Sequence, residues 1–250
     1  MFVRFLWIGL MAGIVAGVPT AAIQHVTTTP LILTAEIYEE ASPAATHAAV
    51  LHMDERQAAK IITAGLVLVH DHGDESHDES WAPEEGVERT FYTAATTIVT
   101  TIGYAFMLLA AMFLSKDRIT PRTGLLWGVA GFAAVGLAPS LGLSPELPGT
   151  AAADVNARQI WWTATVFATA TGLCLVLRIS SVWAILLGLL LMGMPHIIGA
   201  PHPEILTHQI PSELAAQFAS RSLVLHAITW ALAGSAVGYL WNRQGATADV

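Results

Sequence analysis

The stretch TFYTAATTIVTTIGYAFMLLAAMFL, residues Thr90–Leu114, contains no charged side chain. About 20 apolar residues allow a helix to cross the ~30 Å hydrocarbon core of a membrane. A helix is expected because a segment inside lipid must satisfy its own backbone hydrogen bonds. The polar–apolar alternation of a membrane strand is not seen. This stretch therefore predicts a transmembrane helix.

Five further segments have the same character and a similar length. They are Phe5–Ile23, Gly124–Leu143, Ile160–Leu177, Val182–Gly199 and Leu223–Trp241. Only 12% of the 250 residues are charged, whereas a soluble domain carries about 25%. We therefore expect an all-α, polytopic integral membrane protein with about six transmembrane helices.

The first segment has a second interpretation as a signal peptide, because it has a basic start, an apolar core and small residues near its end. However, Gly9, Gly13 and Gly17 recur at every fourth position and share one helix face, which another helix can approach closely. We favour a retained helix over residues 1–24; a cleaved segment would leave five spans. The same spacing recurs at Gly124 and Gly128 and at Gly234 and Gly238.

The charged residues predict how the chain crosses the membrane. With the N-terminus inside, the inner side holds six basic residues and two acids, and the outer side holds five basic residues and seventeen acids. Basic residues in short loops favour the cytoplasmic side, so both termini are expected there. All ten histidines then lie outside. The expected external parts are an acidic, His-containing loop at 25–89 and a His/Pro-rich loop at 195–221, the latter within a five-helix bundle at 90–250.

Composition and missing motifs exclude several classes of function. A net charge of −8 does not describe a nucleic-acid-binding protein, which would carry a basic patch. Cys174 is the single cysteine, so the chain cannot form an internal disulfide or a multi-cysteine zinc site. The sequence contains no phosphate-binding Gly-rich loop, no Gly-x-Ser-x-Gly elbow and no His-Glu-x-x-His pair. We therefore do not expect an enzyme.

The first external loop contains the stretch HDHGDESHDES, residues His70–Ser80, with three histidines and five carboxylates. Neutral imidazole and carboxylate groups are good ligands for divalent first-row metals. His70, His72 and His77 are the candidate ligands, and Gly73 allows the backbone to bend between them. The spacing matches no rigid zinc motif, so such a site would bind weakly and exchange quickly. The alternative is a solvated acidic linker.

A second group of candidate ligands lies in the stretch GMPHIIGAPHPEILTH, residues 193–208. Proline has no backbone donor, so the three prolines of this stretch, the first of them Pro195, are expected to prevent a regular helix. His196 at the end of an apolar run and His202 between two prolines are the candidate metal ligands. For His196 the alternative is a histidine that only packs against a kinked helix end.

Glu146, Asp154 and His226 complete the candidate metal ligands of the outer side. Asp154 and Arg158 are four residues apart and would pair on a helix, which is the structural alternative. No charged residue lies deep in the inner half of any span, so no complete ion path is visible. Either a partner completes the path, or the chain only captures metal, or hydroxyl groups line the path. The candidate hydroxyls belong to Thr96, Thr97, Thr100, Thr101, Thr163 and Thr165.

Several phrases of the sequence together resemble one known family. They are QHVTTTPLILTAEIYE, ERTFYT, GLLWGVAGFAAVGLAPSLGLSPELPG, ARQIWW, PHIIGAPHP and ELAAQFAS. In this order they are similar to the probable cobalt transporter subunit family, CbtA, over nearly the whole chain. The resemblance implies a bacterial inner-membrane protein, a small single-span, His-rich partner subunit (CbtB-like) and a link to cobalt supply for cobalamin. The family's variable His-rich loop corresponds to His70–His77.

We therefore interpret the chain as a permease subunit for a divalent cation, with Co²⁺ first and Ni²⁺ or Zn²⁺ as alternatives. No permanently bound cofactor is expected. The His70–His77 group would capture the ion outside, and the other candidates would line its access route. The alternative is a membrane protein that binds or senses metal without transporting it. A remoter alternative is a membrane enzyme with a His-bound metal.

Overall fold

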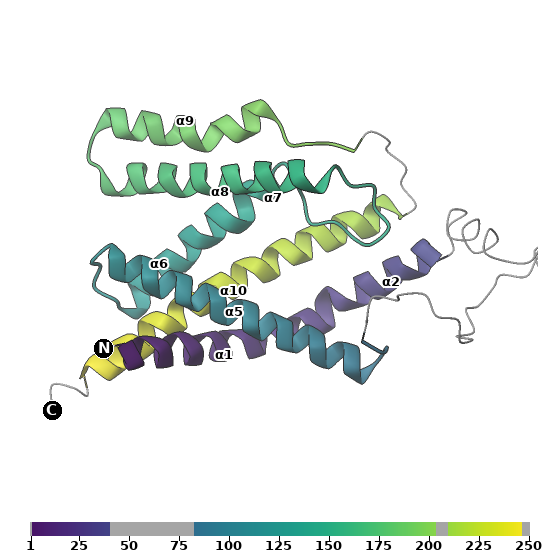
Figure 1. The fold of residues 1–250 in the computed structure, drawn as a ribbon, viewed down its shortest axis with the longest axis horizontal. Helices are drawn as coiled ribbons and strands as arrows, with labels where there is room; N and C mark the ends of the chain where they lie inside the picture. The colour runs from purple at the N-terminus through teal and green to yellow at the C-terminus, as the bar shows by residue number, and fades with distance from the viewer. Residues whose placement is uncertain (1, 41–82, 204–209, 247–250) are drawn as a thin grey trace, which may run out of the picture.

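The computed structural model describes residues 2–40, 83–203 and 210–246, and the regular elements among them are helices (Figure 1). In chain order they are α1 (Phe2–Thr27), α2 (Thr29–Glu40), α5 (Val87–Leu114), α6 (Pro121–Phe132), the π-helix η1 (Ala133–Leu137), α7 (Ala138–Ser140), α8 (Val155–Arg178), α9 (Val182–Ile198) and α10 (Ser212–Ala246). Each of the six predicted segments is therefore helical.

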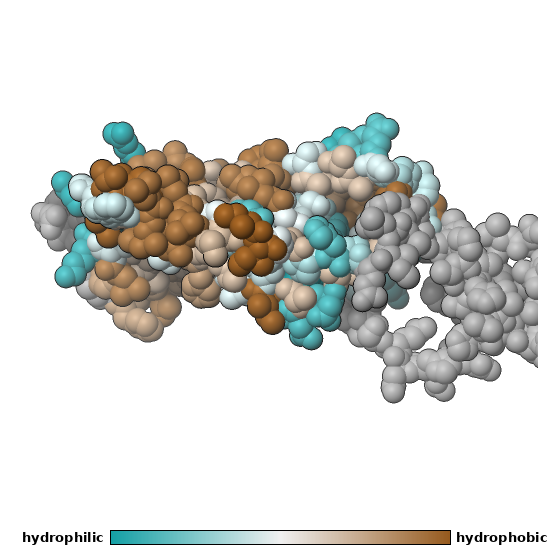
Figure 2. All heavy atoms as spheres, turned by 90° about the horizontal axis from the view of Figure 1, so that it is seen from above, coloured by the Kyte–Doolittle hydropathy of each residue, from teal (hydrophilic) through white to brown (hydrophobic). Residues whose placement is uncertain are grey.

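Five helical stretches of the described chain are long and apolar enough to cross a membrane. They are Phe2–Thr27, Val87–Leu114, Pro121–Ser140, Val155–Arg178 and Ser212–Gln244. The sixth helix, α9, is apolar but has only 17 residues, and it lies alongside α8 (Figure 1). Figure 2 shows apolar residues gathered over one face of the bundle, with hydrophilic residues toward its ends. The chain is a polytopic, all-α membrane protein.

Glycine residues bring the helices into close contact. Gly13 of α1 lies against the backbone of α5, and Gly9 and Gly17 face the same helix. Gly124 of α6 and Gly234 of α10 each lie against the other's carbonyl oxygen. The four-residue spacing of glycines therefore marks close helix contacts, as predicted. α1, α5, α6 and α10 pack into one body, whereas the α8–α9 hairpin touches it mainly through η1 and α7.

The start of α1, the end of α10 and the two short connections, α5–α6 and α8–α9, lie at one end of the bundle, which we call the basic end (Figure 1). There Arg4 Nη2 donates to the Trp241 carbonyl oxygen at 2.6 Å. Arg178, at the end of α8, pairs with Asp117 in the turn between α5 and α6. The basic end carries the six residues assigned to the inner side: Arg4, Lys116, Arg118, Arg122, Arg178 and Arg243.

At the opposite end of the bundle, which we call the α2 end, the structure differs from the prediction. The external loop was expected from residue 25, but the chain continues as α1 and then α2 as far as Glu40. Pro30 lacks a backbone donor, which accounts for the break between the two helices. α2 is stable as far as Glu40 because its apolar side packs against other parts of the chain: Ala35 is fully buried against Leu147 and Ile210.

The third span is not a continuous α-helix. In η1 the Ala138 amide donates to the Ala133 carbonyl, five residues back. Pro139 follows and has no amide to donate, so the regular ladder is already interrupted there. Single π-helical turns often lie next to functional sites. This one contacts His226 of α10: a Cβ added to Gly136 would stand 2.8 Å from His226 Nδ1.

Candidate functional site

The predicted metal ligands are spread over separate parts of the structure. His70, His72 and His77 lie outside the described residues, so metal capture there stays a prediction. Within residues 2–40, 83–203 and 210–246, no three His, Cys, Asp or Glu side chains come close enough together to hold a metal ion.

Glu146 and Asp154 both have structural partners. Arg158 Nη2 donates to Glu146 Oε2 at 2.8 Å, so the ion pair expected between Asp154 and Arg158 is wrong. Asp154 instead precedes α8 and accepts from the Ala157 amide at 2.9 Å. A carboxylate at this N-cap position satisfies one of the free amides of the first turn, which leaves Arg158 to reach back to the preceding loop.

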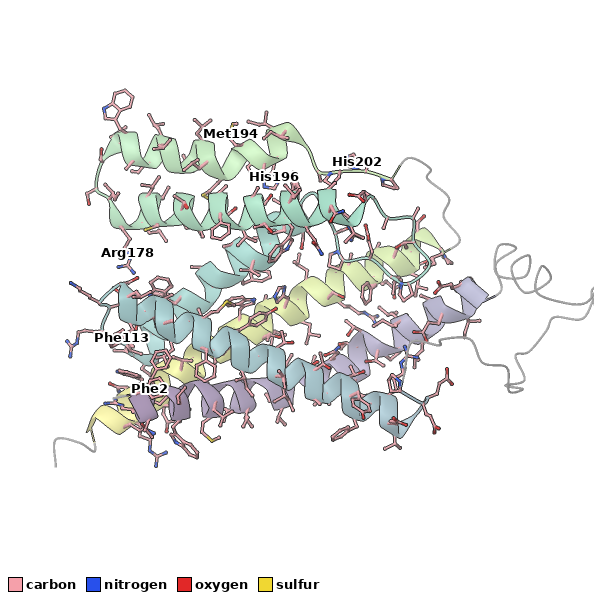
Figure 3. All side chains as sticks on the ribbon, viewed as in Figure 1. Phe2, Phe113, Arg178, Met194, His196 and His202 are labelled. Carbon is pink, nitrogen blue, oxygen red and sulfur yellow. The ribbon has the colours of Figure 1, made fainter. Side chains whose placement is uncertain are left out.

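His196 and His202 lie at the α2 end of α9 (Figure 3). Contrary to expectation, α9 continues through Pro195 to Ile198; the proline has no amide to donate to the Leu191 carbonyl, and helices inside a membrane tolerate such a missing bond. The Pro195 carbonyl accepts from the Gly199 amide at 3.0 Å and from Trp161 Nε1 of α8 at 3.1 Å. The His196 ring packs edge-on against Trp161 at 5.8 Å, and His202 is exposed beyond the helix. Neither imidazole has a hydrogen bond to another described residue, so both can still accept a ligand.

A cleft of about 260 Å³ lies between α1, α5 and α10, with α2 at one edge. Among the described residues that line it there is no charged side chain, one imidazole (His226) and one amide (Gln24). From Phe218 to Thr229 on α10, the lining extends about 16 Å along the helix axis. Its hydroxyl groups belong to Thr20, Thr28, Thr96, Thr97, Thr100, Thr101, Tyr104, Ser222 and Thr229.

Most of the threonine hydroxyls that line the cleft donate their proton to a carbonyl oxygen of the helix. Thr20, Thr101 and Thr229 each donate to the carbonyl four residues back, at 2.9, 2.7 and 2.8 Å. The Thr97 hydroxyl lies 2.6 Å from Gln24 Oε1 and thereby links α5 to α1. A hydroxyl has one proton and two lone pairs, so an oxygen whose proton is engaged offers only acceptors. The cleft wall is therefore uncharged but rich in hydrogen-bond acceptors.

Aromatic side chains pack around Tyr104 and His226, which form the floor of the cleft. Tyr104 of α5 stacks on Trp230 of α10, with ring centroids 4.4 Å apart and an angle of 17° between the rings. Trp230 Nε1 donates to His226 Nε2 at 2.8 Å. Phe132 packs edge-on against the His226 ring from the opposite helix, at 6.0 Å. His226 is therefore held in a defined orientation by three rings.

This arrangement settles which nitrogen of His226 carries the proton. Indole Nε1–H can only donate, so His226 Nε2 is the acceptor and the neutral ring has its proton on Nδ1. A metal ion binds an unprotonated nitrogen, and the single lone pair available is the one that Trp230 occupies. His226 can coordinate a metal at Nε2 only after Trp230 has moved away.

Beyond the floor the bundle is closed. Buried apolar side chains of α1, α5 and α10 fill the space toward the basic end; they include Ile8, Ala12, Leu109, Met112, Ala233 and Val237. The cleft therefore ends inside the bundle in this conformation, in agreement with the lack of a visible ion path through the inner half.

Four of the threonines considered from sequence as path-lining residues, Thr96, Thr97, Thr100 and Thr101, line the cleft. The other two, Thr163 and Thr165, lie on α8 and are not part of its lining. Sequence reasoning missed Gln24, Ser222 and Trp230. The sequence does contain a pattern that could have predicted Gln24: Thr20, Gln24 and Thr28 are spaced four apart, so they form a polar row on one helix face.

The fold and the cleft define a multi-pass helical membrane protein with an uncharged polar cleft between three of its spans. The sequence profile of the family described as probable cobalt transporter subunit (CbtA) matches residues 2–242. The chain belongs to this family. The family's description as a probable cobalt transporter subunit implies a partner subunit and Co²⁺ as cargo. Neither the curated proteins nor the solved structures that were searched include a match to the chain.

Proposed function

We propose that this chain is the permease subunit of a divalent-cation uptake system, with Co²⁺ as the main cargo and Ni²⁺ or Zn²⁺ as competing ions. The observation that carries the proposal is the uncharged, acceptor-rich cleft between α1, α5 and α10. Oxygen acceptors suit a cation, and this cleft brings such acceptors from three spans together. Because α1 forms one wall of the cleft, the proposal requires that the first segment is retained.

The direction of transport in this proposal rests on charge. The six basic residues of the basic end favour a cytoplasmic location, so both termini would lie inside a bacterial inner membrane. The cleft would then open on the outer side, where the His70–His77 segment captures the ion. His196 and His202 would offer further imidazole near the α2 end, together with a small His-rich partner subunit of the CbtB kind.

A second function, metal binding or sensing without transport, is favoured by one observation. The apolar core beyond Tyr104 and Trp230 closes the cleft on the side of the basic end. A transporter must open this core, whereas a sensor need not. In neither role does the chain catalyse a reaction.

Metal accumulation separates these two functions. The chain would be expressed, alone and with its partner, in a host without its own cobalt and nickel uptake, and cellular Co²⁺, Ni²⁺ and Zn²⁺ would be measured. We expect cobalt accumulation that falls at least fivefold in His226→Ala. His25→Ala is the matched control, because His25 is exposed and lies outside the cleft lining. Unchanged metal content with and without the partner would rule out the permease role.

A further inference from the structure

Three basic side chains of the basic end have no acidic partner among the described residues. They are Lys116, Arg118 and Arg122, all exposed, in the turn between α5 and α6 and in the first turn of α6. The acid of the same turn, Asp117, is already paired with Arg178. The other described arginines are all engaged, by carboxylates (Arg89, Arg158, Arg178), by backbone carbonyls (Arg4, Arg221) or by another contact (Arg243). The positive charge of the α5–α6 turn is therefore uncompensated within the described chain.

The backbone that carries these charges is held firmly in place. Ile119 is buried in the apolar core, and the Thr120 carbonyl oxygen would stand 2.2 Å from a Cβ added to Gly238 of α10. The Thr123 hydroxyl donates to the Arg118 carbonyl at 2.7 Å. Arg122 lies in the first turn of α6, where the helix dipole disfavours a cation. An anion beside the turn would offset this repulsion without requiring the backbone to rearrange.

Exposed apolar side chains lie next to these charges, toward the middle of the bundle. Phe113, labelled in Figure 3, and Leu114 end α5 and are 49% and 80% exposed. Leu126, which is 59% exposed, follows Arg122 by four residues and so shares its face of α6. Basic groups directly above exposed apolar ones are typical of a segment at the level of lipid headgroups, where phosphates meet the charges and acyl chains meet the apolar side chains.

We infer that Lys116, Arg118 and Arg122 form a binding surface for the headgroups of anionic phospholipids in the leaflet at the basic end. Guanidinium groups donate two parallel hydrogen bonds to a phosphate, and the lysine ammonium adds a point charge. A soluble phosphate would use these donors alone, whereas a lipid also covers Leu114 and Leu126 with its acyl chains. The inference does not depend on the cargo or on the direction of transport.

Native mass spectrometry of the purified full chain in detergent measures this binding directly. Phosphatidylglycerol and phosphatidylcholine with the same acyl chains would be added in equal amounts. We expect at least fivefold tighter binding of phosphatidylglycerol to the wild type, because each basic residue near the surface adds to the attraction of an anionic lipid. Lys116→Gln/Arg118→Gln/Arg122→Gln should lose this preference. Arg118→Lys/Arg122→Lys, which keeps all three charges, should retain most of it.

The matched control is Arg89→Gln/Arg158→Gln/Arg221→Gln, which removes as many positive charges outside the basic end and should keep the lipid preference. Melting temperatures without added lipid check that each variant is folded. Equal binding of the two lipids to the wild type, or a preference that survives loss of the three charges, would overturn the inference. So would a preference that an excess of soluble glycerol phosphate abolishes, because the site would then take any phosphate. None of these results depends on metal accumulation, so the inference and the proposed function can fail separately.

Discussion

The same three helices build two different halves of the bundle. Along one row of α1, taken in steps of four residues, Ile8, Ala12 and Ala16 are buried in the apolar core, whereas Thr20, Gln24 and, just beyond the helix end, Thr28 line the cleft. α5 shows the same change in the opposite chain direction, from Thr97 and Thr101 to Ala105 and Leu109. α10 changes from Ser222 and His226 to Trp230, Gly234 and Gly238.

The comparison shows how a helical membrane protein can contain a polar cavity at little cost to its fold. Hydroxyl groups on the cleft half satisfy themselves on their own helix, so they need no partner across the cavity. Small residues on the core half let backbones touch, and packing there holds the helices together. Each helix continues from one half into the other, and at the level of Tyr104 and Trp230 only the side chains change, from hydroxyl-bearing to small or apolar.

The largest effect is expected where backbones touch. Gly124→Val places new atoms against the Gly234 carbonyl where α6 crosses α10, and helix backbones cannot yield as a flexible side chain can. We expect a loss of about 3 kcal/mol or more in stability, seen as a much lower unfolding temperature in detergent. Gly103→Ala is the matched control, because a Cβ there meets nothing within 4 Å. Equal melting of the two variants would mean that this crossing is loosely packed.

A smaller effect is expected at the boundary between the halves. Trp230→Phe keeps an aromatic ring against Tyr104 but removes the hydrogen bond to His226 Nε2. The loss in stability should be about 1–2 kcal/mol, because one hydrogen bond between neutral groups inside a membrane contributes about 1 kcal/mol and the smaller ring leaves space at a buried position. The freed Nε2 should also strengthen Co²⁺ binding to the purified protein by severalfold, measured by the visible absorption of the bound ion.

His226→Ala in the Trp230→Phe background should remove the gain in Co²⁺ affinity completely. A gain that persists without the imidazole would show that Trp230 acts on the cleft by its bulk and not by its hydrogen bond. No gain at all would mean that His226 is held away from the ion by Phe132 and Gly136 as well.

Hydropathy and glycine spacing were sufficient to predict the spans and their close contacts, because both depend on residues near one another in the chain. Positions that depend on contacts across the bundle were not predictable in this way. The extension of α2 needs Leu147 and Ile210 as partners, and the packing of α9 on α8 places the Trp161 indole on the Pro195 carbonyl. The cleft was predicted only in part for the same reason. The α5 threonines Thr96, Thr97, Thr100 and Thr101 were expected as possible path-lining residues, whereas the contributions of α1 and α10 depend on how the helices pack.

The smallest effect is expected at the basic end, where an ion pair joins the α8–α9 hairpin to the main body. Asp117 accepts from Arg178 and from Trp127 Nε1, the latter at 2.8 Å, and Figure 3 shows Arg178 directed toward the α5–α6 turn. The hydrogen bonds from Arg178, with the smaller contribution of Trp127, hold the pKa of Asp117 below its ordinary value of 3.8. The pair is partly exposed, so Asp117→Asn should cost about 0–1 kcal/mol.

The pH dependence of this small difference has a definite sign. A carboxylate whose pKa is lower in the folded state stabilises the fold above its unfolded pKa and loses this contribution as the pH falls through the folded value. The wild type should therefore be more stable than Asp117→Asn at pH 7 and equal to it well below pH 3.8. Arg178→Gln should cost as much as Asp117→Asn, and the double variant no more than either, because both remove the same pair. Additive losses would show that Arg178 stabilises the hairpin through the Trp127 ring, 5.4 Å from its guanidinium carbon, and not through Asp117.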